Sequence, residues 1–498
     1  MSAIITEKFR QHNADQFVES FTEASASTYY LFVGKATAYT SATTGGSDST
    51  PPAPADAPGD TEFYAWDSML AAKNVTSADV SYAIPRRNWA NGDTYDMYDD
   101  DISSSSTATS GASNLYDSTF YFMTSDFRVY KVLDNNAGAA YSGAEPTSTS
   151  SSPFELGGYV LKYMYAITTS EAAKYLTSDF IPVSNDSTIT AAATDGKIES
   201  LKITVGTGYT NGTYYAAIYG DGTSAGTSSG GIVRITVASN QIASFGLTAG
   251  SDTTIHAGGA GYTFGTVNLA SGFTFSDTGL SSASAIGGSG GVIEVVISPK
   301  NGHGFSSIKE LGGHYVMSAT TLTQAENDDI TTSNDFRQVG LVVDPTTFGT
   351  STVASSSTAR QTYVIKASSV SGVFEVDEKI TQATTGAVGK VVEYDSTLSL
   401  LYYQQERFGD FGTNSTTGDH SVFTGTNVIT GATSSATFTP SSSSETITLA
   451  NNNTITTVSG YVNPELQPDS GNIVYLENRK PIQRDSDQTE DIKLIIEF

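Results

Sequence analysis

Short runs of apolar residues separated by polar turns dominate the chain, and this spacing is typical of β-strands. Tyr29–Val33 is a continuous apolar run that predicts a buried strand. Phe120–Leu133 predicts a hairpin or one long strand, and Tyr159–Ile167 predicts a further strand. The pattern therefore predicts a mainly β protein with few helices.

Two stretches have helical spacing instead. Thr6 can cap a helix whose apolar residues lie roughly along one face, namely Phe9, Phe17, Val18 and Phe21. A second helix is expected around Trp66–Lys73.

The last residues of the chain alternate between apolar and other positions. Ile492, Leu494, Ile496 and Phe498 fall on one face of an extended segment, which predicts a half-buried final strand. We expect this strand to join the sheet that begins near Tyr29.

Two internal repeats lie in the middle of the chain. In the first, Gly206–Thr210 matches Gly259–Thr263, and Gly230–Ile235 matches Gly290–Val295. In the second, three matched pairs recur at one constant spacing: Phe374 with Phe423, Ile380 with Ile429, and Ala387 with Ala436. Such units bury a face only by packing on a neighbour, so each repeat predicts a small β module.

Length and charge narrow the classes of function. The chain has 498 residues, which suits several domains, and 25 Lys and Arg against 52 Asp and Glu give a net charge of −27. This excess repels phosphates, so we expect no nucleic-acid binding. The absence of cysteine excludes disulfides and thiolate metal sites. No apolar run approaches the ~18 residues of a membrane span, so we expect no membrane insertion.

Catalytic motifs are weak. The G-x-S-x-G pattern occurs at Gly226–Gly230 and Gly287–Gly291, which offers Ser228 and Ser289 as nucleophiles. A nucleophile elbow needs a helix after the serine, whereas Val292–Ile297 has the pattern of a strand. We therefore expect no catalytic residue, no cofactor and no enzyme activity.

Metal ligation has two weak candidates. His303 and His314 can meet across a hairpin as a metal pair, although isolated histidines near glycine are usually polar loop residues. Asp96, Asp99, Asp100 and Asp101 can offer oxygen ligands to calcium, but they lack the alternating spacing of a calcium loop. A solvent-facing acidic loop is the favoured interpretation, and we expect no metal site.

Two places have the residue types that anchor protein interfaces. Arg86 and Arg87 lie beside Trp89, one of only two tryptophans. An ion pair between these arginines and the acidic loop downstream is an equally good alternative. Near the C-terminus, Glu477, Asn478 and Arg479 lie where a strand meets a charged turn. We take all six residues as interface candidates.

The same two places carry a resemblance. The segment AIPRRNW and the ending YLENRKPIQRDSDQTEDIKLIIEF resemble the baseplate wedge subunits encoded by gene eight of T-even-like contractile-tail bacteriophages. EKFRQHNADQF, YYLFVGK, DFRVYKVLDNN and GGYVLKYMYAI are similar in the same order, and Val292–Asp344 matches more weakly. The resemblance implies an all-β, multi-domain structural protein of the virion tail baseplate. It also implies assembly in the host cytoplasm, homodimers, and contacts with other wedge proteins in a ring that rearranges on contraction.

The repeats have no counterpart in that resemblance, which suggests a division of the chain. Residues 1–190, 291–347 and 461–498 are expected to form a β-sandwich-like wedge core, interrupted by two inserted small β modules at 191–290 and 348–460. The alternative function is a tail-associated carbohydrate-binding or depolymerising protein. In that case Tyr209, Tyr214, Tyr262 and Tyr402 would supply a sugar-binding platform, although strand periodicity makes them more simply core residues.

Overall fold

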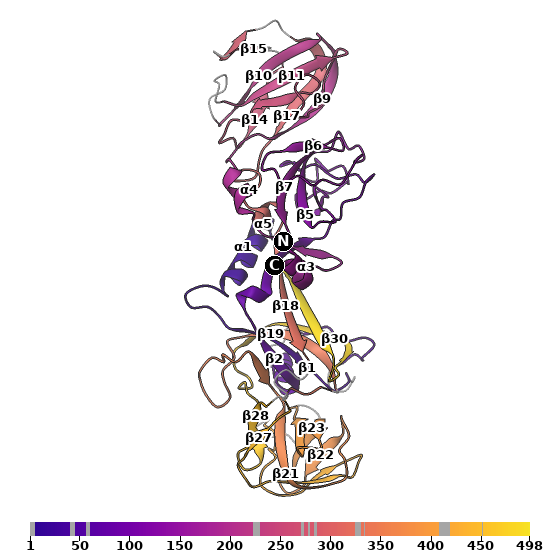
Figure 1. Cartoon of the computed structure of the whole chain (residues 1–498), viewed down its shortest axis with the longest axis vertical. Helices are drawn as coiled ribbons and strands as arrows, with labels where there is room; N and C mark the ends of the chain where they lie inside the picture. Colours follow the sequence, from indigo (N-terminus) through magenta and orange to yellow (C-terminus); the bar gives the residue numbers. More distant parts are fainter. Residues whose placement is uncertain are drawn as a thin grey trace. The chain divides into compact units, whose positions relative to one another are not determined.

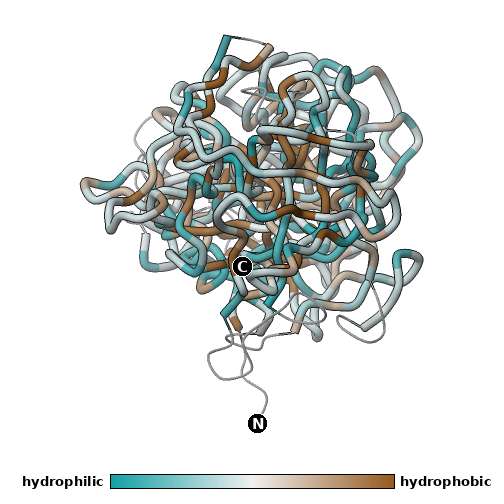
Figure 2. Tube along the Cα trace, turned by 90° about the horizontal axis from the view of Figure 1, so that it is seen from below, coloured by the Kyte–Doolittle hydropathy of each residue, from teal (hydrophilic) through white to brown (hydrophobic). Residues whose placement is uncertain are grey.

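The computed structural model describes residues 5–39, 45–55, 60–222, 230–269, 273–276, 279–282, 286–323, 330–332, 334–407, 419–450 and 452–498. The chain divides into two compact units. Figure 1 labels many of the helices and strands named below. Unit 1 contains Met1–Gln16, Ser81–Met317 and Ile495–Phe498, and unit 2 contains Phe17–Val80 and Ser318–Leu494. Hydrophobic positions run mainly through the interior of the traced chain and hydrophilic ones through its outer loops (Figure 2).

Strands outnumber helices throughout the described residues, which confirms the predicted mainly β, multi-sheet fold. The helices are short: α1 (Glu7–Glu19), α2 (Asp60–Ser68), α3 (Thr169–Tyr175), α4 (Ser187–Ala192), α5 (Ser307–Glu310) and the 3₁₀ turns η1 (Ser77–Asp79) and η2 (Leu115–Asp117).

Unit 1 contains two sheets of its own. The smaller has the order β4 (Tyr121–Met123), β5 (Arg128–Asp134), β7 (Tyr159–Ala166), β6 (Phe154–Leu156). The larger, which we call the first repeat module (residues 200–296), has the order β12 (Gln241–Ile242), β11 (Ile232–Ala238), β10 (Gly212–Gly220), β14 (Gly265–Val267), β17 (Gly287–Val296), β9 (Ser200–Tyr209). Two further strands pair with this path, β13 (Thr254–Ala257) with β11 and β15 (Phe273–Ser276) with β10, and β16 (Gly279–Ser282) pairs with β15.

Unit 2 also contains two large sheets. One has the order β20 (Thr358–Arg360), β2 (Met69–Val75), β1 (Tyr29–Gly34), β19 (Asp335–Val343), β30 (Asn472–Gln483). Figure 1 labels four of these strands. The other is the second repeat module (residues 363–462), with the order β24 (Leu400–Gln404), β23 (Ala387–Asp395), β22 (Lys379–Gln382), β25 (Ile429–Gly431), β26 (Thr437–Pro440), β21 (Tyr363–Ser371), β29 (Tyr461–Val462). A small hairpin joins β27 (Thr446–Thr448) to β28 (Thr454–Thr456).

A last sheet has four strands among the described residues. Its order is β31 (Thr489–Glu497), β18 (Tyr315–Thr323), β3 (Val80–Pro85), β8 (Phe180–Pro182).

Three predicted strands are confirmed. All six residues of β1 are buried, because this strand has a neighbour on each side, β2 and β19. Residues 121–134 form the hairpin of β4 and β5, and β7 then pairs with β5.

The first helix begins where predicted but buries a different face. The side-chain oxygen of Thr6 accepts a hydrogen bond from the backbone N–H of Phe9 (3.3 Å). Phe9 itself is 53 % exposed, and the buried residues of α1 are Gln11 and Ala14. Gln11 is buried because its Nε2 donates to the carbonyl of Lys309 (3.0 Å). A side-chain amide with a partner thus replaces the apolar contact that the spacing suggested.

The second predicted helix is wrong in its second half. Helix α2 ends at Ser68, and Met69–Val75 is strand β2. The Ser68 hydroxyl donates to the Tyr64 carbonyl (2.6 Å) at the end of the helix, and β2 then pairs with β1 on one side and β20 on the other. Burial between two strands outweighs the helical spacing of the local sequence.

The final strand exists, but its predicted sheet is wrong. β31 lies beside β18, whereas β30 is the C-terminal strand in the sheet of β1. Only Leu494 of the four apolar residues is fully buried, because β31 is at the edge of its sheet.

In the first repeat module, matched residues make matched contacts. The hydroxyl oxygen of Tyr209 accepts from the N–H of Gly291 (2.9 Å), and that of Tyr262 accepts from the N–H of Gly231 (3.0 Å). A Cβ at either glycine would lie within 3 Å of the tyrosine hydroxyl oxygen, so a side chain would displace the ring. The sequence repeat is therefore a repeat of structure.

In the second repeat module, the matched residues share one core. Phe374, Phe423, Ile380, Ile429, Ala387 and Ala436 are all buried in it. The copies also pair directly, since Thr381 of β22 lies opposite Thr430 of β25.

Candidate functional site

The predicted interface segment at Arg86–Trp89 follows strand β3. Arg86 donates from Nε to Asn88 Oδ1 (2.9 Å) and from Nη1 to the Thr177 carbonyl (2.7 Å). Arg87 donates from Nη2 to the Tyr116 carbonyl (2.8 Å). Its guanidinium carbon lies 4.4 Å from the centre of the Tyr121 ring.

Neither arginine pairs with a carboxylate among the described residues, so the alternative of an ion pair with the acidic loop is not observed. Trp89 meets the Tyr141 ring edge-on, at 5.7 Å between ring centres. Two donors of the segment, Nη1 of Arg87 and Nε1 of Trp89, are buried and have no hydrogen-bond partner among the described residues. The segment thus keeps unused donors.

The second group of interface candidates lies on β30 in unit 2, whereas Arg86–Trp89 belongs to unit 1. Asn478 accepts from Gln338 Nε2 (2.8 Å) and donates to the Pro52 carbonyl (2.9 Å). Glu477 and Arg479 form an ion pair at 3.3 Å, and both side chains are more than one-third exposed.

β30 is the edge strand of its sheet, and it is poorly suited to accept another strand. Its pairing with β19 is interrupted by two register shifts, and Lys480 and Pro481 follow the ion pair. Bulges, charges and proline all hinder edge-to-edge pairing. A partner protein would therefore contact this edge through side chains and not by adding a strand to the sheet.

The acidic loop faces solvent only at Asp100 and Asp101, so the favoured interpretation is wrong for Asp96 and Asp99. Asp96 is only 1 % exposed and accepts hydrogen bonds from Ser110 and Thr119, including both backbone N–H groups (2.8 and 2.7 Å). Burial raises the pKa of Asp96, but these hydrogen bonds outweigh it and the pKa is lowered. Asp99 is 8 % exposed and pairs with Lys202 (2.7 Å). Asp96 and Asp99 are thus already bonded within the protein.

The two histidines considered as a metal pair have different partners. His303 bonds to Lys131, and His314 Nδ1 lies 3.4 Å from Glu7 Oε2. The described residues contain no group of three or more side chains suited to hold a metal ion. No helix among them is long and apolar enough to cross a membrane.

The other chemical candidates are also accounted for. Ser289 lies within strand β17, so the helix of a nucleophile elbow is missing there, and Ser228 lies outside the described residues. Tyr209, Tyr262 and Tyr402 are at most 4 % exposed, and Tyr214 packs against the same core as Tyr209. Three of the four tyrosines therefore cannot form a sugar-binding platform.

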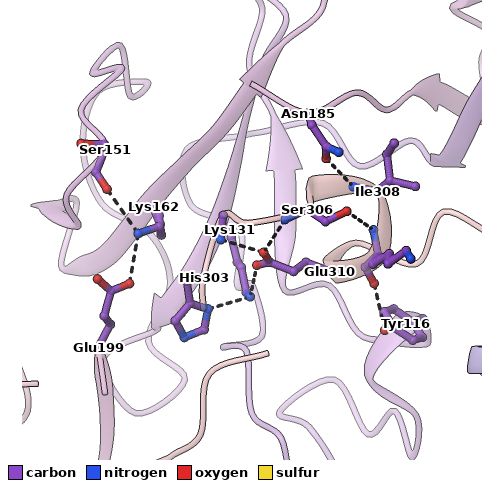
Figure 3. A network of polar contacts seen from close by, with 12 residues as sticks. Tyr116, Lys131, Ser151, Lys162, Asn185, Glu199, His303, Ser306, Ile308 and Glu310 are labelled. Carbon is purple, nitrogen blue, oxygen red and sulfur yellow. Dashed lines mark hydrogen bonds and ion pairs between the residues drawn. The ribbon is translucent and has the colours of Figure 1, made fainter. Parts of the chain in front are cut away.

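A buried network that the sequence analysis missed lies in unit 1 (Figure 3). Lys131 of β5 and Lys162 of β7 are directly opposite each other in the strand pairing. Lys131 pairs with Glu310 (2.9 Å) and Lys162 with Glu199 (3.0 Å), and these four side chains are at most 9 % exposed. We call these four residues the lysine clamp.

Besides its ion pair with Glu310, the ammonium group of Lys131 makes two further contacts. Its Nζ also bonds to Nδ1 of His303 (2.8 Å) and lies 3.7 Å from the centre of the Tyr98 ring. An ammonium group only donates, so Nδ1 is the acceptor and the imidazole proton lies on Nε2. Burial lowers the pKa of Lys131, against the opposing charge of Glu310. Burial, together with the charge of Lys131, lowers the pKa of His303 well below its usual value.

The carboxylates of Glu310 and Glu199 also accept hydrogen bonds from groups outside the lysine clamp. Oε1 of Glu310 accepts from the backbone N–H groups of Gly304 (2.7 Å) and Ser306 (3.3 Å). Oε1 of Glu199 accepts from Lys197 (2.9 Å), and Lys162 also donates to the Ser151 carbonyl (3.2 Å). The sequence did contain a signal for this network, because Lys131 and Lys162 each interrupt an apolar strand.

Unit 2 has a comparable cluster built on a guanidinium group. Arg407 bonds through Nη2 to Asp67 (2.9 Å) and to Asp469 (2.7 Å), and its Nε also donates to Asp67 (3.0 Å). Asp67 is buried, which raises its pKa, but hydrogen bonds from His420 and Arg407 outweigh burial and lower it. We call Arg407, Asp67 and Asp469 the arginine clamp.

These observations define a class: a β-rich protein of several sheets with clusters of ion pairs in each unit. The family model Phage-Gp8, described as Bacteriophage T4, Gp8, matches residues 3–142 and 442–498. The two ends of the chain are similar to this family of baseplate wedge subunits, and the family supports a place in the virion tail baseplate, in association with other baseplate proteins. Among curated proteins, none matches the chain.

Proposed function

We propose that this baseplate protein joins neighbouring wedge subunits through the Arg86–Trp89 segment and takes part in the rearrangement of the baseplate on contraction. The observation that carries the proposal is the pair of unused donors, Nη1 of Arg87 and Nε1 of Trp89. A buried donor without an acceptor costs free energy, and a carboxylate or carbonyl of another subunit would remove that cost.

The edge of unit 2 supports a second contact. Glu477 and Arg479 are partly exposed on an edge that resists strand addition, so they offer opposite charges to a partner's side chains. The protein that makes these contacts is a homodimer in our proposal, as the resemblance of its two ends implies.

The division of the chain into a wedge core and two inserted modules is also part of this proposal. The family match omits residues 143–441, which include the first repeat module and most of the second. The first and last strands of the second repeat module pair with each other, Val364 opposite Val462, so its ends are neighbours. Neighbouring ends are what an inserted module needs.

The test replaces Arg86 and Arg87 together by alanine. We expect assembly with purified wedge proteins to fall at least about tenfold, as measured by co-sedimentation, because two anchoring cations are lost from the contact. The matched control is Arg234→Ala, since among the described residues Arg234 donates to threonine hydroxyls of the first repeat module and to no other group.

The opposite result would contradict the proposal. Unchanged assembly with a lowered melting temperature would mean that the arginines act only on Thr177, Tyr116 and Tyr121 of their own chain. Light scattering of the unassembled protein tests the dimer, and a stable monomer at micromolar concentration would refute that part.

A further inference from the structure

Two like charges face each other in the interior of unit 1. Lys131 and Lys162 are cross-strand neighbours on β5 and β7, and residues in such positions have Cβ atoms about 5 Å apart. Their side chains are 0 % and 3 % exposed, so water does not screen the repulsion. The arrangement is stable only while each ammonium group keeps its own carboxylate.

Those carboxylates come from the two connections of the first repeat module. Glu199 directly precedes Ser200, the first residue of β9. Glu310 follows β17, the last strand of the module, and its Oε1 holds the backbone N–H groups of Gly304 and Ser306 on the way. The connection that enters the module and the connection that leaves it are thus tied to the same pair of lysines (Figure 3).

We propose that the lysine clamp is a lock on these connections. While both lysines are paired, residues 195–199 and 297–306 are held against β5 and β7. Loss of one carboxylate charge releases the connection to which that carboxylate belongs, and the module stays folded but can change its direction relative to β5 and β7.

The module stays folded because its core is largely its own. Its buried cluster contains Leu201, Tyr209, Ile218, Val233 and Ile293, and β5 and β7 contribute only Leu133 and Val160. These apolar contacts and the strand pairings within the module do not involve the lysine clamp. Release is therefore separable from unfolding.

Hydrogen exchange of the full chain, followed by mass spectrometry, tests the lock. In Glu310→Gln, the amide oxygen can still accept from Gly304 and Ser306, but Lys131 loses its counter-charge. We expect amide exchange in 297–306 to rise at least about tenfold, while exchange in β10 and β11 stays as in the parent. In Glu199→Gln, the same rise is expected in 195–199.

Glu294→Gln is the matched control. Glu294 belongs to the same module and lies 3.5 Å from Lys202, but its side chain is 61 % exposed, so no change is expected in either connection. Two results would overturn the proposal: unchanged exchange in both connections in both clamp variants, or an equal rise in β10, β11 and the connections, which would mean general destabilisation. Should Glu310→Gln not fold, Glu199→Gln decides, because Lys162 keeps the Ser151 carbonyl as a hydrogen-bond partner.

Discussion

The lysine clamp of unit 1 and the arginine clamp of unit 2 are both clusters of ion pairs at the end or edge of a repeat module, but the positions of the cations and the carboxylates are exchanged. In unit 1 the cations lie on core strands and the carboxylates on the connections of the first repeat module. In unit 2 the cation, Arg407, follows β24 of the second repeat module, and the carboxylates Asp67 and Asp469 lie outside that module. Both repeat modules therefore make ion pairs with residues outside the module or in its connections.

The chemistry of the two cations differs. A guanidinium group makes a planar fork that matches two carboxylates at once and stays charged under all ordinary conditions. An ammonium group is a point charge whose protonation responds to burial, and burial does lower the pKa of Lys131. The charge of the lysine clamp therefore depends on how far its lysines are buried. The strength of the arginine clamp depends instead on the geometry of the planar guanidinium group.

Lys131→Met is expected to produce the largest effect. It leaves Glu310 buried with only backbone donors, and an unpaired buried charge costs about 3–5 kcal/mol of unfolding free energy. Urea unfolding measures the loss. Each unit has one tryptophan, so Trp89 fluorescence in a Trp66→Phe background reports on unit 1 alone.

The double variant Lys131→Met with Glu310→Met sharpens this result. It removes both charges of the pair, and we expect it to recover most of the stability, because well-packed apolar residues often replace a buried ion pair without loss. A single variant as stable as the parent would show that Glu310 finds another cation.

Arg407→Lys tests whether geometry matters in unit 2. Lysine keeps the charge but cannot bond to Asp67 and Asp469 through a planar fork, so we expect a loss of about 1–3 kcal/mol. Trp66 fluorescence in a Trp89→Phe background follows unit 2 for this measurement. An unchanged unfolding midpoint would mean that charge alone suffices, and the contrast between the clamps would disappear.

The smallest expected effect is on the pH dependence of the unfolding free energy, through His303, which bonds to Lys131 of the lysine clamp. His303 is neutral in the folded protein because burial lowers its pKa well below the unfolded value of about 6.5. Below that pH the unfolded chain binds a proton that the folded chain does not, so stability falls by up to about 1.4 kcal/mol per pH unit. Above about pH 6.5, His303 is neutral in both the folded and the unfolded chain, so it contributes nothing to the pH dependence of stability.

His303→Gln should remove this part of the slope between pH 6.5 and 5, measured by urea unfolding with Trp89 as reporter. His12→Gln, at an exposed position of α1, is the control. Equal slopes in the parent and in His303→Gln would show that His303 titrates in the folded state as in the unfolded one.

Local pattern was enough to predict the strands but not the contacts between distant segments. β1 and the β4–β5 hairpin were predictable because unbroken apolar runs fit only buried strands. The end of α2 was not, because β1 and β20 convert Met69–Val75 into a central strand. The same holds for β31, whose neighbour β18 is set by the fold and not by its own alternation.

Charged residues were harder still. Lys131 interrupts an apolar strand, but the local sequence does not indicate its partner, because Glu310 is 179 residues away along the chain. A run of acidic residues usually faces solvent, yet Asp96 and Asp99 are buried, because their donors lie on later segments, at Ser110, Thr119 and Lys202. A sequence motif shows which charged groups a segment contains, but it does not show which of them form contacts in the fold.

The pairing of Thr381 with Thr430 has a geometric consequence for the second repeat module. Antiparallel pairing of equivalent residues places a local two-fold axis between β22 and β25, so each copy presents the same surface to the other. That is the isologous contact by which two separate, identical chains form a symmetric dimer. Covalent linkage of the copies makes the association intramolecular and therefore independent of protein concentration. The module is, in effect, a dimer within one chain.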